Sequence, residues 1–350
     1  MLFLFTLREL LPPLEVAITF GMIFFVLSWV LPRKVVTLPS DARRRAILGW
    51  TGVAGSLLVV VVATISSALA ARRENVVYTG VDGWFGRPAP LLCAVVVVAI
   101  AALILRAGAL PAPGERAIAP RRPWHTYAPR PVLWVAAVAA ALLALTALWQ
   151  TLIATFATED GRFFGRTAAF SDLPIYMRFN QGYGYIVGVG WPNYLATLVV
   201  LVLALLVFIA ALRSDANRPV SAGASMATVR VERDQTARVV TFILLGGLVT
   251  TLGAVWMHAG SIGEVSVGFG EEWVSDDQSF PRFYVGGGYD AFAGPMNLAG
   301  YALQGVGVAF LLRIATDTAR SALMLGRTSR RISADTTPTE DEAAATGARR

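Results

Sequence analysis

Long apolar stretches alternate with shorter polar segments along most of the chain. Seven stretches are nearly free of charge, and each has about the length of a bilayer-crossing helix, roughly 20 residues. They cover residues 13–31, 46–70, 89–107, 131–157, 191–212, 238–258 and 295–315. Lipid offers no hydrogen-bond partners to an exposed strand, so we expect each stretch to be a helix. The pattern predicts an all-α integral membrane protein with a seven-helix domain over residues 1–327.

The overall composition supports this fold class. The chain is 55% hydrophobic and 15% charged, whereas an average soluble domain is about 25% charged. The final segment, residues 328–350, is different because it mixes Ser, Thr, acids and arginines without apolar periodicity. We therefore expect it to be a disordered cytoplasmic tail.

The basic residues are concentrated in every second polar segment, and this distribution predicts an orientation in the membrane. Segments 32–45, 106–130, 213–238 and 313–350 hold 22 of the 30 basic residues and 10 of the 23 acidic residues. The rest of the chain holds 8 basic and 13 acidic residues. Short basic loops stay in the cytoplasm, so the N-terminus should lie outside and the C-terminus inside. Topology thus accounts for the net charge of +7, and we expect no nucleic-acid partner.

With this orientation, the chain reads as one helix followed by three parallel helical hairpins. The hairpins cover residues 46–107, 131–212 and 238–315, and each has a glycine- and aromatic-rich external loop. Two of these loops carry the same pattern, R-F-x-x-G-x-G-Y, at 178–185 and 282–289. The segment around 80–91 resembles them only faintly, so it stays open whether the first hairpin is a true copy.

The repeated pattern allows two interpretations. In one, the loops bind a ligand or a partner, with the arginines meeting an anionic group and the tyrosines stacking. In the other, the glycines form turns that pack the loop onto the helix ends, and arginine and tyrosine are anchors. The residues concerned are Arg178, Phe179, Gly182, Gly184, Tyr185, Arg282, Phe283, Gly286, Gly288, Tyr289 and Asp290.

A few polar side chains lie in or near the predicted spans. They are Glu15, Gln150, His258, Asn297 and Gln304. Polar groups at such positions either form hydrogen bonds between helices or line a permeation path. Glu15 lies in the first turn after Pro12-Pro13, where it can reach water and favours the helix N-terminus.

The sequence contains no complete set of catalytic or metal-binding residues. Cys93 is the only cysteine, and His125 and His258 fall on opposite sides of the predicted membrane, so we expect no cysteine or histidine metal site. No phosphate-binding G-K-[ST] loop is present. Asp276 and Asp277 offer oxygen ligands or acid–base groups, but a solvated external loop also explains them. We expect no cofactor, no metal and no catalytic centre.

Three functions remain open after these exclusions. The preferred one is a permease-like or accessory subunit of a membrane transport or envelope complex, with the bilayer and other membrane or envelope proteins as partners. The alternative is a membrane sensor, receptor or scaffold that uses the external loops. The third is an outer-face enzyme on a lipid-linked substrate, with Asp276, Asp277 and Asp290 as the acids. The location should be the plasma membrane, and the single lysine, Lys34, among 29 arginines indicates a GC-rich bacterial source.

Overall fold

A computed structural model describes most of the chain. The described residues are 13–30, 35–72, 85–108, 110–117, 122–156, 175–179, 182–186, 191–264, 266–269, 273–275, 278–280, 283–286 and 289–335. In the strands and at several helix ends the description covers the backbone alone.

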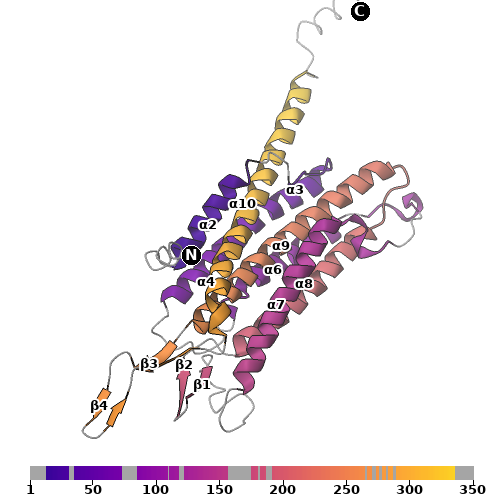
Figure 1. Cartoon of the computed structure of the whole chain (residues 1–350). Coiled ribbons are helices and arrows are strands. Elements are labelled where there is room, and N and C mark those ends of the chain that lie inside the picture. Colours follow the sequence, from indigo (N-terminus) through magenta and orange to yellow (C-terminus); the bar gives the residue numbers. More distant parts are fainter. Residues whose placement is uncertain are drawn as a thin grey trace, which may run out of the picture.

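Helices make up the body of the molecule (Figure 1). They are α2 (Pro13–Leu27), α3 (Ala42–Trp50), α4 (Ser56–Arg72), α6 (Ala89–Arg106), α7 (Arg130–Phe156), α8 (Trp191–Ala216), α9 (Met226–Gly263) and α10 (Asp290–Asp335). A π-helical turn, Thr51–Gly55, joins α3 to α4, so these two run as one continuous helix. Two short 3-10 turns, Pro113–Glu115 and Trp124–Tyr127, lie between α6 and α7.

Six helices of the described chain are long and apolar enough to cross a membrane. They are Ala42–Ala68, Ala89–Arg106, Arg130–Leu152, Asn193–Ala216, Met226–Ser261 and Ala291–Met324. Each overlaps a predicted stretch, which confirms the prediction of a multi-pass helical membrane protein. The remaining stretch, 13–31, contains α2, which has 15 residues. Such a helix extends about 22 Å, less than the roughly 30 Å of a hydrocarbon core, so the seventh crossing stays a prediction.

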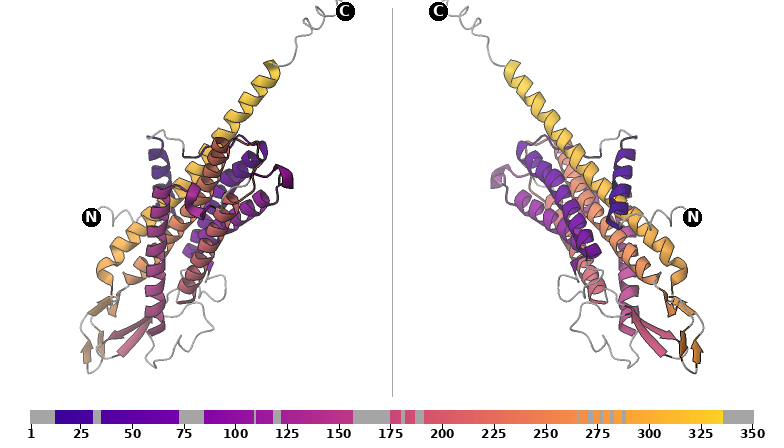
Figure 2. Two further views of the ribbon diagram at one scale, coloured as in Figure 1. Left: turned by 90° about the vertical axis from the view of Figure 1, so that its right-hand side faces the viewer. Right: turned by 90° about the vertical axis from the view of Figure 1, so that its left-hand side faces the viewer.

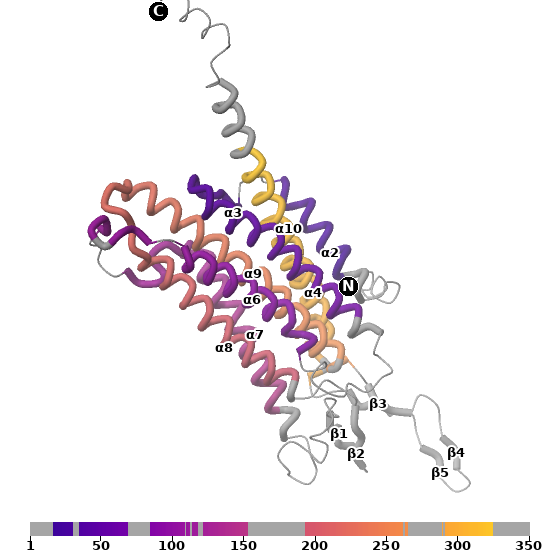
Figure 3. The backbone as a smooth tube through the Cα atoms, turned by 180° about the vertical axis from the view of Figure 1, so that it is seen from behind, coloured from indigo at the N-terminus to yellow at the C-terminus, as the bar shows by residue number. Residues whose placement is uncertain are grey.

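Helix α9 forms the centre of the bundle. In the most apolar stretch of α9, 18 residues long, 89% of the residues are buried. Helices α6, α7, α8 and α10 all pack against α9 (Figure 3). The outer helices instead expose large apolar side chains, such as Trp134 and Leu145 on α7. Apolar side chains on the outside and small or polar ones inside are what a lipid-embedded bundle requires.

The contact between α9 and α10 is built on glycines spaced seven residues apart. A Cβ added to Gly253 would lie 2.7 Å from the Gly300 carbonyl oxygen, and one on Gly300 would lie 2.6 Å from Cα of Met257. Gly260 and Gly307 are equally close to the opposite backbone, with Cβ positions 2.6 Å from the Ala293 oxygen and 2.7 Å from the Thr250 nitrogen. No side chain fits there, so the two backbones approach directly and form one rigid hairpin.

Three two-stranded antiparallel ribbons lie at one end of the bundle (Figure 1). They pair β1 (Ile175–Phe179) with β2 (Gly182–Ile186), β3 (Ser266–Phe269) with β6 (Phe283–Gly286), and β4 (Trp273–Ser275) with β5 (Gln278–Phe280). We call this the ribbon end. The connection from α8 to α9 lies at the opposite end, which we call the arginine end because its polar segments contain most of the arginines.

Helix α10 is longer than the sequence predicts. It has 46 residues and continues to Asp335, beyond the other helices at the arginine end (Figure 2). The segment 328–335 is therefore helical where the sequence predicts disorder. The preceding residues, such as Ala322, Leu323 and Met324, are good helix formers, and extending an existing helix costs far less than starting one. The remainder of the predicted tail, 336–350, lies outside the described residues.

Candidate functional site

Polar side chains from four helices meet near the ribbon end, inside the bundle. Gln150 comes from the last part of α7, Tyr194 from the first turn of α8 and His258 from the last part of α9. Tyr289 directly precedes α10, and Asn297 lies in its second turn. We call these five residues the polar cluster. Their helices all begin or end here, which is why residues far apart in the sequence come together.

One ring contact joins two members of the polar cluster, and hydrogen bonds join two others to the backbone of α9. The rings of Tyr194 and His258 stack with centroids 6.5 Å apart. The Tyr289 hydroxyl donates a hydrogen bond to the Ala259 carbonyl at 3.1 Å, and the Asn297 amide donates to the Met257 carbonyl at 2.7 Å. These bonds fasten the start of α10 to the last turns of α9.

Several polar atoms in the cluster have no hydrogen-bond partner within the described chain. They are Nε2 of Gln150, the hydroxyl of Tyr194, Nε2 of His258 and Oδ1 of Asn297. Gln150, Tyr194 and Asn297 are each at most 3% exposed. A buried polar atom without a partner costs about 1–3 kcal/mol, so a group of them at one place needs a physical explanation.

Tyr289 acts as an anchor of the loop. Its ring packs edge-on against Trp149, with centroids 4.8 Å apart, while its hydroxyl bonds to α9. Burial raises the pKa of the Tyr289 hydroxyl, and the neighbouring Gln150 side chain acts in the opposite direction. For this residue the structure therefore supports the second interpretation of the motif, in which the loop packs onto the helix ends.

The two copies of the motif fold differently. In the first, Arg178 and Phe179 end β1, and Gly182, Gly184 and Tyr185 belong to β2, so the motif turns back on itself and Arg178 lies opposite Tyr183. In the second, Phe283 and Gly286 belong to one strand, β6, which pairs with the distant β3. Arg282 and Gly288 lie outside the described residues. The proposed repeat of these loops thus stays a prediction.

The prolines after the two motifs are also placed differently. Pro192 is the second residue of α8, as expected for a proline in a first helical turn. Pro295, in contrast, lies inside α10, because that helix already begins at Asp290. The expected start at Pro295 is therefore wrong, and Tyr289 and Asp290 mark the beginning of the helix.

The remaining predicted polar residues do not join the polar cluster. Gln304 is buried deeper in the bundle, where its amide donates to Oγ of Ser67 at 2.9 Å and links α10 to α4. Glu15 and Asp290 are placed by their backbone only, in the first turns of α2 and α10. Asp276 and Asp277 lie outside the described residues.

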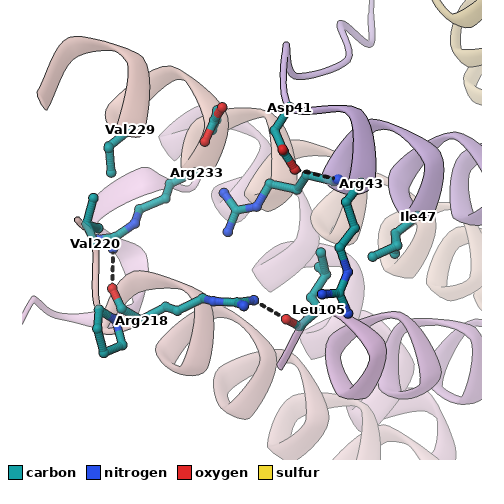
Figure 4. A pocket seen from close by; sticks show the side chains of 11 residues that line it. Asp41, Arg43, Ile47, Leu105, Arg218, Val220, Val229 and Arg233 are labelled. Carbon is teal, nitrogen blue, oxygen red and sulfur yellow. Dashed lines mark hydrogen bonds between the residues drawn. The ribbon is translucent and has the colours of Figure 1, made fainter. Parts of the chain in front are cut away.

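A second site, at the arginine end, was missed by sequence reasoning. A pocket of about 360 Å³ lies between the start of α3, the ends of α6 and α8, and the start of α9 (Figure 4). We call it the arginine pocket. Its lining is Asp41, Arg43, Arg44, Ile47, Leu105, Arg218, Pro219, Val220, Val229, Glu232 and Arg233.

Most of the arginines in this pocket also hold the fold together. Arg44 forms an ion pair with Asp215. Arg218 donates to the Leu105 carbonyl at the end of α6, and burial lowers the pKa of its guanidinium, with Arg44 acting in the same direction. Arg233 donates to the carbonyls of Ala216 and Arg218, each at 2.6 Å. Cations at helix C-termini are favourable because the carbonyls there are otherwise unpaired.

No local pattern in the sequence marks this pocket. Its arginines come from positions 43, 44, 218 and 233, and the charge bias that indicates topology already explains their number. Only the packing of the helix ends shows that they share one space. Among the described residues, no group of three His, Cys, Asp or Glu side chains is placed to hold a metal ion.

Comparison with known proteins gives no further guide. The chain matches no protein family, and neither a curated protein nor a solved structure is significantly similar to it. Function therefore has to be argued from the two sites themselves.

Proposed function

We propose that the protein is a permease-like membrane subunit that works without a catalytic centre of its own. In this proposal, the polar cluster binds a small, uncharged polar solute on its way across the membrane. The observation that carries the proposal is the set of unpartnered polar atoms on Gln150, Tyr194, His258 and Asn297.

The position of these atoms supports a solute rather than a protein as their partner. They are buried among α7, α8, α9 and α10, where a partner protein has no access. Water or a small polar solute can supply the missing hydrogen bonds, because each needs only a few donors and acceptors. The side chains offer amide, phenol and imidazole groups, which suit a neutral solute better than an ion. Arg87, just before α6, is a cation near both Tyr194 and His258.

We propose the following topology for this function. The ribbon end lies outside, the arginine end lies in the cytoplasm, and α2 is the seventh crossing of a bacterial plasma membrane. The charge bias supports the orientation, and the exposed apolar side chains of α2, such as Met22 and Val26, support its contact with lipid. Other subunits of a transport or envelope complex would then bind at the ribbon end or along the arginine end.

Flux measurements on the whole chain test the proposal. The protein is purified in mild detergent, its native mass is recorded to detect co-purifying subunits, and it is reconstituted into liposomes. Permeability to water, glycerol and urea is then followed by light scattering. We expect permeability above that of protein-free liposomes for at least one of these probes, and a lower value for Tyr194→Phe. Permeability equal to that of empty liposomes for all three, with any co-purified subunits present, contradicts the proposal.

The length of α10 favours a second function, that of a sensor or scaffold. This helix runs from the ribbon end through the bundle and projects beyond the other helices at the arginine end (Figures 1 and 2). A single rigid element of this kind can connect an external binding event to a cytoplasmic partner. Deleting residues 328–350 should then abolish partner capture by the purified protein while membrane insertion is unchanged. A deletion without effect on any partner would count against this function.

A further inference from the structure

The arginine pocket lies at the level where three apolar helices end. Of the four candidate spans that border it, one begins at Ala42 and two end at Arg106 and Ala216. The fourth, within α9, lines the pocket through Val229, Glu232 and Arg233. Its polar lining consists of four arginines and two acids, and its apolar lining is Ile47, Leu105, Pro219, Val220 and Val229. This level, where apolar sequence gives way to polar sequence, is that of the lipid headgroups. Basic pockets between helices at this depth are suited to anionic lipid headgroups.

The pocket carries an excess of positive charge. Four arginines line it, against two acids, Asp41 and Glu232. The Asp41 carboxylate caps α3 by accepting a hydrogen bond from the backbone N–H of Arg44 at 2.7 Å. Part of its capacity to accept hydrogen bonds from the arginines is therefore already used. Asp215, just outside the lining, pairs with Arg44. The net positive charge of the pocket therefore favours binding of an anion.

Arg43 differs from the other three arginines of the pocket, which each form an ion pair or a hydrogen bond within the fold. Its side chain is exposed, and no carboxylate in the described part of the chain forms an ion pair with it. A Cβ on Gly108 would lie 3.0 Å from Nη1 of Arg43, and it would also touch the Arg218 guanidinium. Two guanidinium groups therefore lie side by side over Gly108. Two guanidinium charges this close repel each other, and an anion bound between them would offset the repulsion.

We propose that the arginine pocket binds a phosphate group, supplied by an anionic phospholipid of the adjoining leaflet, with Arg43 and Arg218 as its main contacts. Guanidinium groups match phosphate oxygens because their planar N–H donors form paired, charge-assisted hydrogen bonds. The volume of about 360 Å³ is ample for a hydrated phosphate, since a water molecule takes roughly 30 Å³. The site is independent of the polar cluster and of the function proposed for it.

Lipid titration of the whole purified chain tests this site. Native mass spectrometry measures binding of phosphatidylglycerol, of phosphatidylcholine and of inorganic phosphate in separate titrations. The variant Arg43→Gln removes the exposed arginine without removing any side-chain hydrogen bond found among the described residues. The matched control is Arg230→Gln, which removes an exposed arginine on α9 at the same end but outside the pocket.

The expected result is preferential binding of phosphatidylglycerol to the wild-type chain. Arg43→Gln should weaken it about tenfold, the size of one lost charge-assisted hydrogen bond, whereas Arg230→Gln should leave it unchanged. Binding of inorganic phosphate alone, with the same dependence on Arg43, would overturn the lipid as the source and keep the phosphate site. Equal losses in both variants, or no Arg43-dependent binding of either probe, would overturn the site.

Discussion

Two buried tyrosine hydroxyls at opposite ends of the bundle differ in their hydrogen bonding. The Tyr127 hydroxyl accepts hydrogen bonds from Nη1 of Arg122 at 2.7 Å and from Nη1 of Arg233 at 3.4 Å. The Tyr194 hydroxyl has no hydrogen-bond partner within the described chain, although its side chain is only 2% exposed. The first hydroxyl stabilises the fold, and the second is an energetic cost that a function at the polar cluster would explain.

Replacing each tyrosine by phenylalanine separates these two roles. We expect Tyr194→Phe to raise the free energy of unfolding by about 1 kcal/mol, because it removes a buried group without a partner. Tyr127→Phe should lower it by about 1 kcal/mol, because it removes a hydrogen-bond acceptor that two arginines share. Thermal unfolding in detergent measures both changes. A Tyr194→Phe variant that loses as much stability as Tyr127→Phe would show that its hydroxyl is paired after all.

Among the elements, the α9–α10 hairpin is the most tightly constrained. Gly253 and Gly300 lie where the two backbones touch, so neither position accepts a side chain without separating the helices. The same hairpin carries His258 and Asn297 and thereby positions two of the five residues of the polar cluster. The segment just after α2 contacts the hairpin at its other end, where Arg313 and Arg320 of α10 lie over the ring of Trp29. Their Cζ atoms are 3.6 and 4.1 Å from the ring centroid.

A larger residue in this contact should destabilise the bundle. We expect Gly300→Val to lower the free energy of unfolding by about 1–3 kcal/mol, the usual cost of overpacking, or by more if the hairpin separates. Gly223→Ala is the control, because no atom lies within 4 Å of the Cβ it would add. Detergent unfolding and protease resistance of the two variants provide the measurement. Equal stability of both would contradict the close approach of α9 and α10.

For the whole molecule, the most consequential prediction is its orientation in the membrane. The ribbon end and the arginine end lie at opposite ends of the bundle, so residues 223 and 275 should lie on opposite sides of the membrane. The excess of arginines at one end then places residue 223 inside.

Single-cysteine labelling checks this orientation directly. Cys93→Ser first removes the native thiol, and Gly223→Cys or Ser275→Cys then supplies one reporter. A membrane-impermeant maleimide added to intact cells should label position 275 and should reach position 223 only after permeabilisation. Labelling of position 223 in intact cells would reverse the topology, and labelling of both would contradict the spans between them.

Sequence alone predicted those parts of the fold that the solvent dictates locally. The expected span 89–107 and the observed α6, Ala89–Arg106, nearly coincide, because in lipid an apolar run has no alternative to a helix. The extensions of α9 back to Met226 and of α10 to Asp335 were missed. These segments are polar, and their helices continue from packed elements rather than from a local apolar signal.

For the sites, the sequence determined which residues are unusual, and the tertiary structure decided which of them meet. Gln150, His258 and Asn297 stand out as polar residues in or near apolar runs, but only helix packing joins them with Tyr194 and Tyr289. In the sequence, Arg43 and Arg218 are two of many basic residues in the polar segments. Only the packing of the helix ends brings both guanidinium groups next to Gly108. The physical reason is that hydrophobicity acts residue by residue along the chain, whereas the glycine contacts that align α9 with α10 depend on the shape of both helices at once.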